Sequence, residues 1–298
     1  MKVGILGGNG FIGSNLCSLI AKNEKVISFD ICEPIKLNNN IQYITGDYFD
    51  LPSIEEIVKD VDIIVHAISL LNPTNSNEKY LIWYSREVVQ LVHLCDLISV
   101  YDKKLIFISS GGTVYGDAYS VAVKEDFATN PLNHYGSVKV CMENVIRTFR
   151  HQVGLKACIA RVSNPYGQGQ DFHKGVGFID AVVRNGMQGN VIEVWGDGEN
   201  IRDYIHIDDA CKMIYALCKN KTLEDIYNIS TGIGTSQNQI IAYVSHTLGP
   251  LSVIYKSKRL VDVRASILDN SRIRKIYIEP LTPIREGIVT YIEYLKTL

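Results

Sequence analysis

Tyr135 and Lys139, in the middle of the chain, carry side chains that can move a proton. They are four residues apart, so in a helix they share one face. A tyrosine with an ordinary pKa near 10 is a poor base, and a pKa of about 7 requires roughly 4 kcal/mol of preferential stabilisation of the phenolate. An ammonium group on the next turn, with a further positive charge nearby, can supply it. The pair is a candidate acid and base, although Tyr-x-x-x-Lys alone is common and usually inert.

A glycine-rich turn near the N-terminus has the spacing that binds a dinucleotide. An expected strand at 2–6 runs directly into Gly7-Gly8-Asn9-Gly10-Phe11-Ile12-Gly13, where a helix is expected to begin. Such a turn lets backbone N–H groups approach a pyrophosphate, with the phosphates resting on the helix N-terminus. Asp30, at the end of the second strand, can accept hydrogen bonds from both ribose hydroxyls. A 2′-phosphate there would meet a like charge, so the pattern predicts NAD rather than NADP.

These groups need a sheet to position them, and the hydrophobic pattern of the first half predicts one. Six β-branched runs alternate with four helical patterns. We expect strands at 2–6, 25–29, 41–45, 61–67, 104–109 and 156–161, and helices at 11–21, 53–59, 79–99 and 132–152. Gly154 is placed to end the last helix. The alternation predicts an α/β fold, a Rossmann-type doubly wound parallel sheet.

The second half indicates a smaller lobe that is interleaved with the first. Glycine and proline become frequent after Asn164, which is typical of loop-rich structure. A strand at 202–207, a helix at 208–219 and a strand at 226–229 then resume the earlier pattern. We therefore expect residues 1–163, with a returning segment at about 203–232, to bind the cofactor, and residues 164–202 and 233–298 to bind the substrate.

Composition excludes several classes of function. The 298 residues include 30 basic and 32 acidic side chains, so no global field favours nucleic acid or an anionic membrane. The apolar stretches are shorter than the ~20 residues that span a bilayer. The polar, glycine-rich start leaves no room for a signal-peptide core. Seven cysteines without a C-x-x-C pair indicate no metal site. We expect a cytoplasmic protein that binds neither nucleic acid nor a membrane.

Over almost its whole length the chain resembles the extended short-chain dehydrogenase/reductases, and within them the NAD-dependent nucleotide-sugar epimerases and dehydratases. The motifs that carry this resemblance are the glycine turn, Asp30, Gly46-Asp47, the Ser109 to Gly116 strand end, Tyr135 with Lys139, and the segments Asn164 to Gly167 and Gly196 to Tyr204.

The resemblance implies the ligand contacts. Those to NAD are Gly7, Gly10, Phe11, Ile12, Gly13, Asp30, Asp47, His66, Tyr135 and Lys139. The nucleotide diphosphate of the substrate would be held by Asn164, Arg202 and Arg259, and an arginine fork suits phosphate. The residues also allow plainer interpretations: His66 as a packed core histidine, Arg202 in a salt bridge to a neighbouring aspartate, and Arg259 in a solvated basic patch.

The chain departs from the family at the hydroxyl that partners the tyrosine. In the family this hydroxyl usually lies at the position that Gly111 occupies in this chain. Glycine has no hydroxyl, so the role passes to Ser110 or Thr113. If strand alternation continues, Thr113 shares the face of position 111 and Ser110 points away, so we favour Thr113 as the catalytic hydroxyl. The acid pair of the dehydratases is replaced by Gly112 and Thr113, which argues against a dehydratase.

The activity that the resemblance implies is NAD-dependent 4-epimerisation of a UDP-hexose, either UDP-glucose and UDP-galactose or their N-acetylated forms. Tyr135 would take the 4-hydroxyl proton while C4 passes a hydride to NAD, and the hydride would return to the other face of the 4-keto sugar. A nucleotide-sugar reductase or dehydrogenase is the alternative, and a catalytically silent NAD-binding protein is a third. We expect a homodimer.

Overall fold

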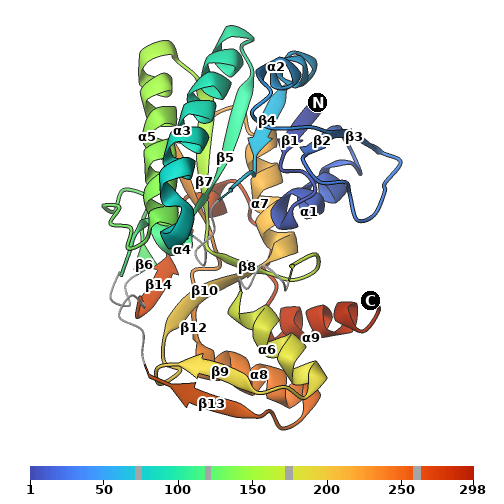
Figure 1. Ribbon diagram of the computed structural model, residues 1–298, viewed down its shortest axis with the longest axis vertical. Helices are drawn as coiled ribbons and strands as arrows, with labels where there is room; N and C mark the ends of the chain where they lie inside the picture. The colour runs from blue at the N-terminus through green and yellow to red at the C-terminus, as the bar shows by residue number, and fades with distance from the viewer. Residues whose placement is uncertain (71–75, 118–121, 172–176, 258–262) are drawn as a thin grey trace. The chain divides into compact units, whose positions relative to one another are not determined.

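The computed structural model describes residues 1–70, 76–117, 122–171, 177–257 and 263–298 (Figure 1). These residues form two compact units. Unit 1 consists of Met1–Ser110, Asn133–Arg161 and Cys211–Tyr227, and unit 2 of Gly111–Leu132, Val162–Ala210 and Asn228–Leu298. Arg259, one of the expected substrate contacts, lies outside the described residues.

A seven-stranded sheet forms the centre of unit 1. From edge to edge its strands are β11 (Ile226–Ile229), β7 (Lys156–Val162), β5 (Lys104–Ser110), β4 (Ile63–His66), β1 (Lys2–Leu6), β2 (Lys25–Asp30) and β3 (Ile41–Thr45). The strands from β5 to β3 pair in parallel. The expected Rossmann-type doubly wound α/β fold is confirmed, with 226–229 adding a seventh strand at the edge.

The order of these strands reverses beside β1. Strands β2 and β3 lie on one side of β1, whereas β4, β5 and β7 lie on the other. In open parallel sheets, ligands bind at the carboxyl ends of the strands where the order reverses. The glycine turn follows β1 at this point, and Ala67 follows β4.

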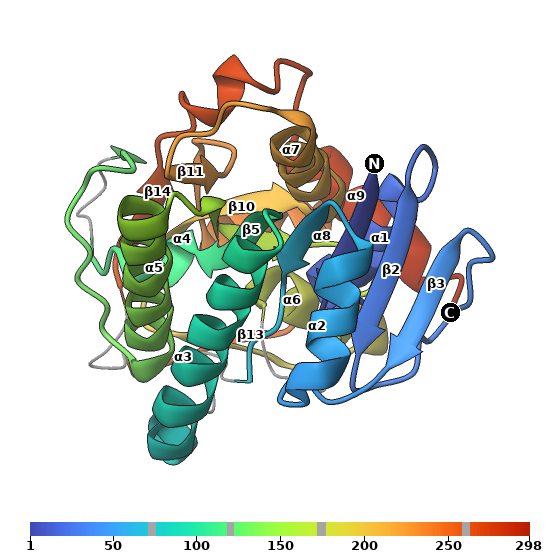
Figure 2. The same ribbon diagram turned by 90° about the horizontal axis from the view of Figure 1, so that it is seen from above.

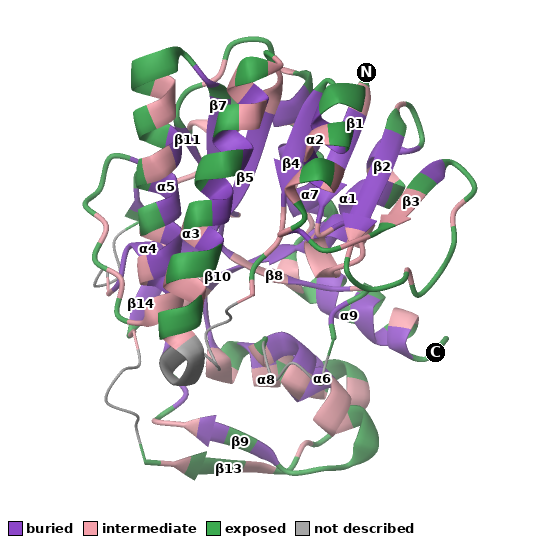
Figure 3. Cartoon of the chain, turned by 45° about the horizontal axis from the view of Figure 1, so that its top comes forward, coloured by how far each residue is buried: buried purple, intermediate pink, exposed green. Residues whose placement is uncertain are grey.

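Helices cover both faces of this sheet. The helices α2 (Leu51–Asp60), α3 (Ser76–Val100) and α5 (His134–Val153) pack on one face, and α1 (Phe11–Ile20) and α7 (Ile207–Lys219) lie on the other (Figure 2). The inner strands are buried (Figure 3). Helix α5 begins where the Asn133 side chain accepts a hydrogen bond from Gly136 N at 2.8 Å, and it ends at Gly154, whose φ is 71°.

Unit 2 has a mixed sheet and its own hydrophobic core. The sheet contains β12 (Gly234–Ser236), β10 (Ile201–His206), β14 (Ala265–Leu268), β6 (Ala122–Val123) and β8 (Asn164–Tyr166). Strand β10 is antiparallel to β12 and parallel to β14 and β8. Unit 2 also contains α4 (Gly111–Val114), α6 (Phe178–Gln188), β9 (Ile192–Trp195), α8 (Gln237–Leu248), β13 (Val253–Lys256) and α9 (Ile284–Leu295).

Two features of this division differ from the expected domain boundaries. The strand expected at 202–207 is β10, which pairs with strands of unit 2, so the chain returns to unit 1 at Cys211 and not at about 203. Residues 111–132 belong to unit 2, although we expected them in the cofactor domain. Both differences arise because long-range strand pairing, through β10 and β6, decides which sheet a segment joins.

None of the described helices is long and apolar enough to cross a membrane. Within the same ranges, no three histidine, cysteine, aspartate or glutamate side chains converge as metal ligands would.

Candidate active site

The glycine turn between β1 and α1 is too crowded for larger residues. Gly7 has a φ of 84°, which favours glycine, and its N–H donates to Phe29 O at 2.8 Å. A side chain at Gly13 would place its Cβ only 2.8 Å from Gly8 Cα. Gly10 is the N-cap of α1, so no side chain covers the first N–H groups of that helix. The turn therefore has the shape and the exposed helix N-terminus that a pyrophosphate requires.

Asp30 is attached to this turn at the end of β2. Its carboxylate accepts hydrogen bonds from Asn9 N at 3.0 Å and from Cys32 N at 3.1 Å. This contact places a carboxylate beside the pyrophosphate turn, where a dinucleotide presents its ribose. Asp47 is exposed and accepts a hydrogen bond from Phe49 N at 3.0 Å, which orders the segment after β3.

His66 is enclosed at the end of β4. The side chain is 1% exposed, its Nε2 lies 3.0 Å from Tyr48 Oη, and its ring centre lies 5.4 Å from that of Phe107. Burial, assisted by the charge of Lys139, lowers its pKa to about 3, so the ring is neutral. This environment fits the packed histidine, and a contact with the cofactor stays a prediction.

The structure brings Tyr135 and Ser110 together. Ser110 is the last residue of β5, Tyr135 is the second residue of α5, and their side chains share a hydrogen bond. Burial raises the pKa of Tyr135 to about 12, the charge of Glu87 adds to that rise, and the hydrogen bond from Ser110 opposes it. Tyr135 is therefore protonated at neutral pH in the chain without ligands.

Lys139 lies one turn after Tyr135 on α5, as the spacing predicted, and it is buried. Its side chain is 3% exposed, and its Nζ donates to Ile108 O at 3.2 Å. The ammonium lies 6.0 Å from the ring centre of Tyr135 and 5.0 Å from that of Phe107. Burial lowers the pKa of Lys139, and the charges of Glu87 and Glu143 oppose that shift.

Three buried charged side chains around this pair, Glu87, Glu143 and Arg161, are not among the residues expected from the sequence. Glu143 forms a two-point ion pair with Arg161, with Oε2 at 2.6 Å from Nη2, and it accepts a hydrogen bond from Ser109. Glu87 is 2% exposed. The position of Glu143, four residues after Lys139, is a signal that could have revealed it. Nothing in the sequence distinguishes Glu87 from a surface residue of α3.

Unit 2 holds the other candidates. Asn164 Nδ2 donates to Asp203 O at 2.9 Å, which fixes Asn164 beside β10. A side chain at Gly112 would place its Cβ 3.2 Å from Asn164 Oδ1. Arg202 is half-buried and donates to Ile201 O at 2.8 Å. Thr113 lies in α4, so residues 111–114 are helical and do not continue β5 as we expected. The expectation that strand alternation places Thr113 on the face of position 111, and Ser110 on the other face, is therefore wrong.

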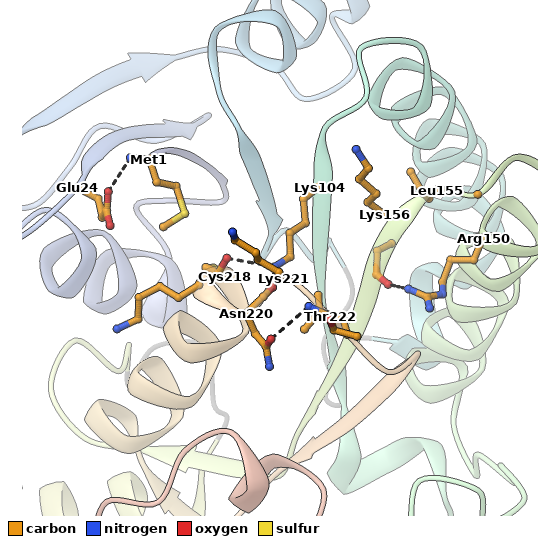
Figure 4. A pocket seen from close by; sticks show the side chains of 14 residues that line it. Met1, Glu24, Lys104, Arg150, Leu155, Lys156, Cys218, Asn220, Lys221 and Thr222 are labelled. Carbon is orange, nitrogen blue, oxygen red and sulfur yellow. Dashed lines mark hydrogen bonds and ion pairs between the residues drawn. The ribbon is translucent and has the colours of Figure 1, made fainter.

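A cavity in unit 1 lies at the amino ends of β5 and β7 (Figure 4). Two of the basic side chains that line it, Lys104 and Arg150, have protein partners. Lys104 Nζ donates to the carbonyls of Leu217, Cys218 and Asn220 near the end of α7 at 2.7, 3.1 and 2.7 Å. Arg150 pairs with Asp225 at 2.6 Å. These bonds account for Lys104 and Arg150 without a ligand.

Comparison with known proteins gives consistent matches over the whole chain. Residues 3–230 match the NAD dependent epimerase/dehydratase family. A Methanocaldococcus jannaschii protein provisionally named UDP-glucose 4-epimerase is 30% identical over 299 residues, covering 98% of this chain and 97% of the relative. An Escherichia coli dTDP-4-dehydro-6-deoxyglucose reductase is 27% identical, covering 98% and 96%. The crystal structure of Thermotoga maritima UDP-glucose 4-epimerase with UDP-glucose is 27% identical, with a TM-score of 0.92 over 100% of this chain and 99% of that one.

Proposed function

The chain belongs to the NAD dependent epimerase/dehydratase family, and from that premise we propose that it is an NAD-dependent 4-epimerase of a UDP-hexose. The observation that carries this proposal is the hydrogen bond between Ser110 and Tyr135, one turn before the buried Lys139. The three groups lie in the unit that also holds the glycine turn and Asp30. An acid–base group and a dinucleotide turn in one unit are what a hydride-transfer enzyme requires.

NAD is the cofactor of this family, and the residues present fit it. Because Gly7 and Gly13 carry no side chains, the backbone of the turn can approach a pyrophosphate closely. Asp30 supplies the carboxylate for a ribose. When bound, NAD supplies a hydride acceptor that can also return the hydride.

We assign the proton transfer to Tyr135. Its phenol oxygen takes the proton of the sugar 4-hydroxyl, and the hydroxyl of Ser110 stabilises the phenolate through their hydrogen bond. Lowering the pKa from about 12 to about 7 requires roughly 7 kcal/mol of added stabilisation. The ammonium of Lys139, held in the core by its bond to Ile108 O, supplies part of that stabilisation, and a bound cationic ring supplies the rest.

We assign substrate binding to unit 2. Asn164 and Arg202 would hold the nucleotide diphosphate, and Arg259 would join them. The hydrogen bond from Asn164 to Asp203 O holds the amide beside β10, the strand that carries Arg202. The T. maritima relative, which was crystallised with UDP-glucose, supports UDP as the nucleotide. A firmly held diphosphate with a loosely held pyranose lets the 4-keto sugar turn over between the two hydride transfers.

The E. coli relative named as a reductase favours a second candidate function, reduction of a 4-keto nucleotide sugar. The two activities use the same acid–base pair and differ in whether the cofactor leaves after each turnover. Asp30 argues against NADPH, which biosynthetic reductases commonly use. The bonded Ser110 and Tyr135 argue against a silent protein. Neither Gly112 nor Thr113 can act as the acid that a dehydratase requires.

We further propose that the protein is a cytoplasmic homodimer. Helix α3 exposes Leu81, Ile82, Val89 and Val92, and the last three follow helical spacing along one stripe. An exposed apolar stripe of this kind is typical of a surface that another chain covers. Light scattering should give twice the chain mass for the parent protein and the mass of one chain for Val89→Glu.

A panel of UDP- and dTDP-sugars tests the proposed activity. The purified protein is incubated with each sugar without added cofactor, and the products are identified by NMR. Interconversion of a UDP-hexose and its C4 epimer would support the proposal. Reduction of a 4-keto nucleotide sugar that occurs only when NADH or NADPH is added, measured in a second set of incubations, would support the reductase.

A further inference from the structure

Asn9 lies between the glycines of the turn, at a position where the dinucleotide pattern does not require an asparagine. It forms three hydrogen bonds with β2 and the segment that follows it. Its backbone N–H donates to Asp30 Oδ2 at 3.0 Å, and its Nδ2 donates to Cys32 O at 2.6 Å. Its Oδ1 accepts from Ser28 Oγ at 2.8 Å. Asn9 therefore joins the glycine turn to the end of β2 at three points.

Three hydrogen bonds among Asn9, Asp30 and Cys32 form a closed ring. Asp30 Oδ2 accepts from Asn9 N, Asp30 Oδ1 accepts from Cys32 N at 3.1 Å, and Cys32 O accepts from Asn9 Nδ2. Both carboxylate oxygens are therefore held. Each keeps a lone pair for a further donor, because an ionised carboxylate offers about four acceptor positions. The side chain of Asn9 thus holds the backbone of Cys32, whose N–H fixes one of the two oxygens.

Ser28 fixes the orientation of the Asn9 amide. Cys32 O can only accept a hydrogen bond, so the amide nitrogen of Asn9 must face it and the amide oxygen must face the Ser28 hydroxyl. Ser28 is fully buried under the turn, where a Cβ at Gly8 would lie 2.9 Å from Ser28 Cα. The backbone of the turn therefore packs directly on Ser28, which leaves the Asn9 amide little freedom to rotate.

We propose that Asn9 is a positioning residue for NAD, which acts by holding the Asp30 carboxylate in one orientation. A held carboxylate accepts from the ribose hydroxyls without losing rotational freedom when the cofactor binds. It also presents a fixed negative charge to the 2′-phosphate of NADP, whereas a free carboxylate can turn away from that phosphate. Asn9 therefore increases the preference of the chain for NAD over NADP. This role rests on the proposed contact between Asp30 and the ribose, and it does not depend on which sugar the chain converts.

Competition between the two nucleotides tests this role without turnover. The protein is incubated with equal, excess concentrations of NAD and NADP until the ratio of the bound nucleotides is constant, and that ratio is measured by chromatography after gel filtration and denaturation. Asn9→Ala keeps the backbone N–H and removes both side-chain hydrogen bonds. It is compared with Asp30→Asn and with the double variant. Asn185→Ala is the matched control, since it removes a half-buried asparagine of α6 that donates to Ala181 O at 2.8 Å.

We expect the bound ratio of NAD to NADP to fall about threefold to tenfold in Asn9→Ala and to keep the parent value in Asn185→Ala. In the Asp30→Asn background, Asn9→Ala should leave the ratio unchanged, because the charge that Asn9 positions is absent. If Asn9→Ala does not fold, Ser28→Ala, which removes the bond to Asn9 Oδ1, should lower the ratio about twofold or more.

A parent ratio in Asn9→Ala, or in Ser28→Ala where that variant replaces it, would show that Asn9 only supports the turn and would overturn the proposal. An equal fall in both backgrounds would also overturn it, because Asn9 would then act independently of Asp30. A parent ratio in Asp30→Asn would reject the contact of Asp30 with the ribose and, with it, the role of Asn9. A lowered ratio in Asn9→Ala of a chain that converts no UDP-sugar would sustain the role of Asn9 and reject the proposed activity.

Discussion

The side chain of Ser110, the last residue of β5, shares a hydrogen bond with that of Tyr135 in the first turn of α5. This bond supports the proposal that Ser110 is the hydroxyl partner of the proposed acid–base group. The expectation for Thr113 depended on a strand that continued through the glycine pair, whereas residues 111–114 form α4.

Replacing the two hydroxyls separately tests this assignment. Ser110→Ala should reduce turnover by about 10-fold to 100-fold, because a hydrogen bond to a charged group contributes about 1.5–3 kcal/mol. Thr113→Val, which is nearly isosteric, should reduce it less, and the NAD content should be similar in both variants. Steady-state turnover with matched protein concentrations measures the difference. A larger loss in Thr113→Val would return the role to Thr113.

Tyr135→Phe tests the proton-transfer group itself. The substitution removes one hydroxyl and leaves the ring packed, so the fold and NAD binding should persist while turnover falls by about 10²–10⁴-fold. Circular dichroism and calorimetry provide the controls for fold and cofactor. Near-normal turnover in this variant would exclude Tyr135 from the mechanism.

Cofactor preference follows from the position of Asp30. Because its carboxylate is bonded to Asn9 N in the glycine turn, a 2′-phosphate would approach a fixed negative charge. NAD should bind at least about tenfold more tightly than NADP, which corresponds to about 1.4 kcal/mol. Asp30→Asn should reduce the difference in affinity between NAD and NADP. Equal affinities in the parent protein, measured by calorimetry, would contradict the assigned role.

His66 should make the folded state sensitive to acid. Burial lowers its pKa to about 3 in the folded chain, while the unfolded chain keeps the ordinary value of about 6.5. The unfolded state therefore binds the proton first, so the stability that His66 contributes is present above about pH 6.5 and is lost as the pH falls toward 3. Between about pH 7 and 5 the parent should lose roughly 2 kcal/mol more free energy of unfolding than His66→Phe. Urea unfolding at each pH measures the free energy of unfolding of both proteins. Equal losses of this free energy in the parent and in His66→Phe would show that His66 is not buried in its neutral form.

Local patterns predicted unit 1 well because its elements follow from short-range chemistry. The glycine turn, Asp30 at the end of β2 and the stop at Gly154 each depend on neighbouring residues, and each is where the pattern placed it. The spacing of Tyr135 and Lys139 likewise predicted a shared helix face.

What the sequence could not reveal depends on distant partners. Strand β10 is fixed by hydrogen bonds to β12, β14 and β8, and nothing in residues 201–206 shows that they avoid the first sheet. Asp203 is buried, and its carboxylate is compensated by hydrogen bonds that Thr231, Gly232 and Leu268 donate from distant segments. Glu87 is similar: it is buried on α3, and its carboxylate accepts a hydrogen bond from Leu70 N, which precedes that helix in the chain.

Incubation with UDP-glucose in D₂O, without added nicotinamide cofactor, tests the proposed 4-epimerase activity most directly. Because the same hydride leaves C4 and returns to its other face, we predict UDP-galactose that carries protium at C4, formed over many turnovers by protein that retains its NAD. Proton NMR resolves the two sugars and the isotope at C4 in one measurement. The proposed UDP-glucose activity would be contradicted by no conversion without added cofactor, by a reaction that stops after one turnover per bound NAD, or by deuterium at C4.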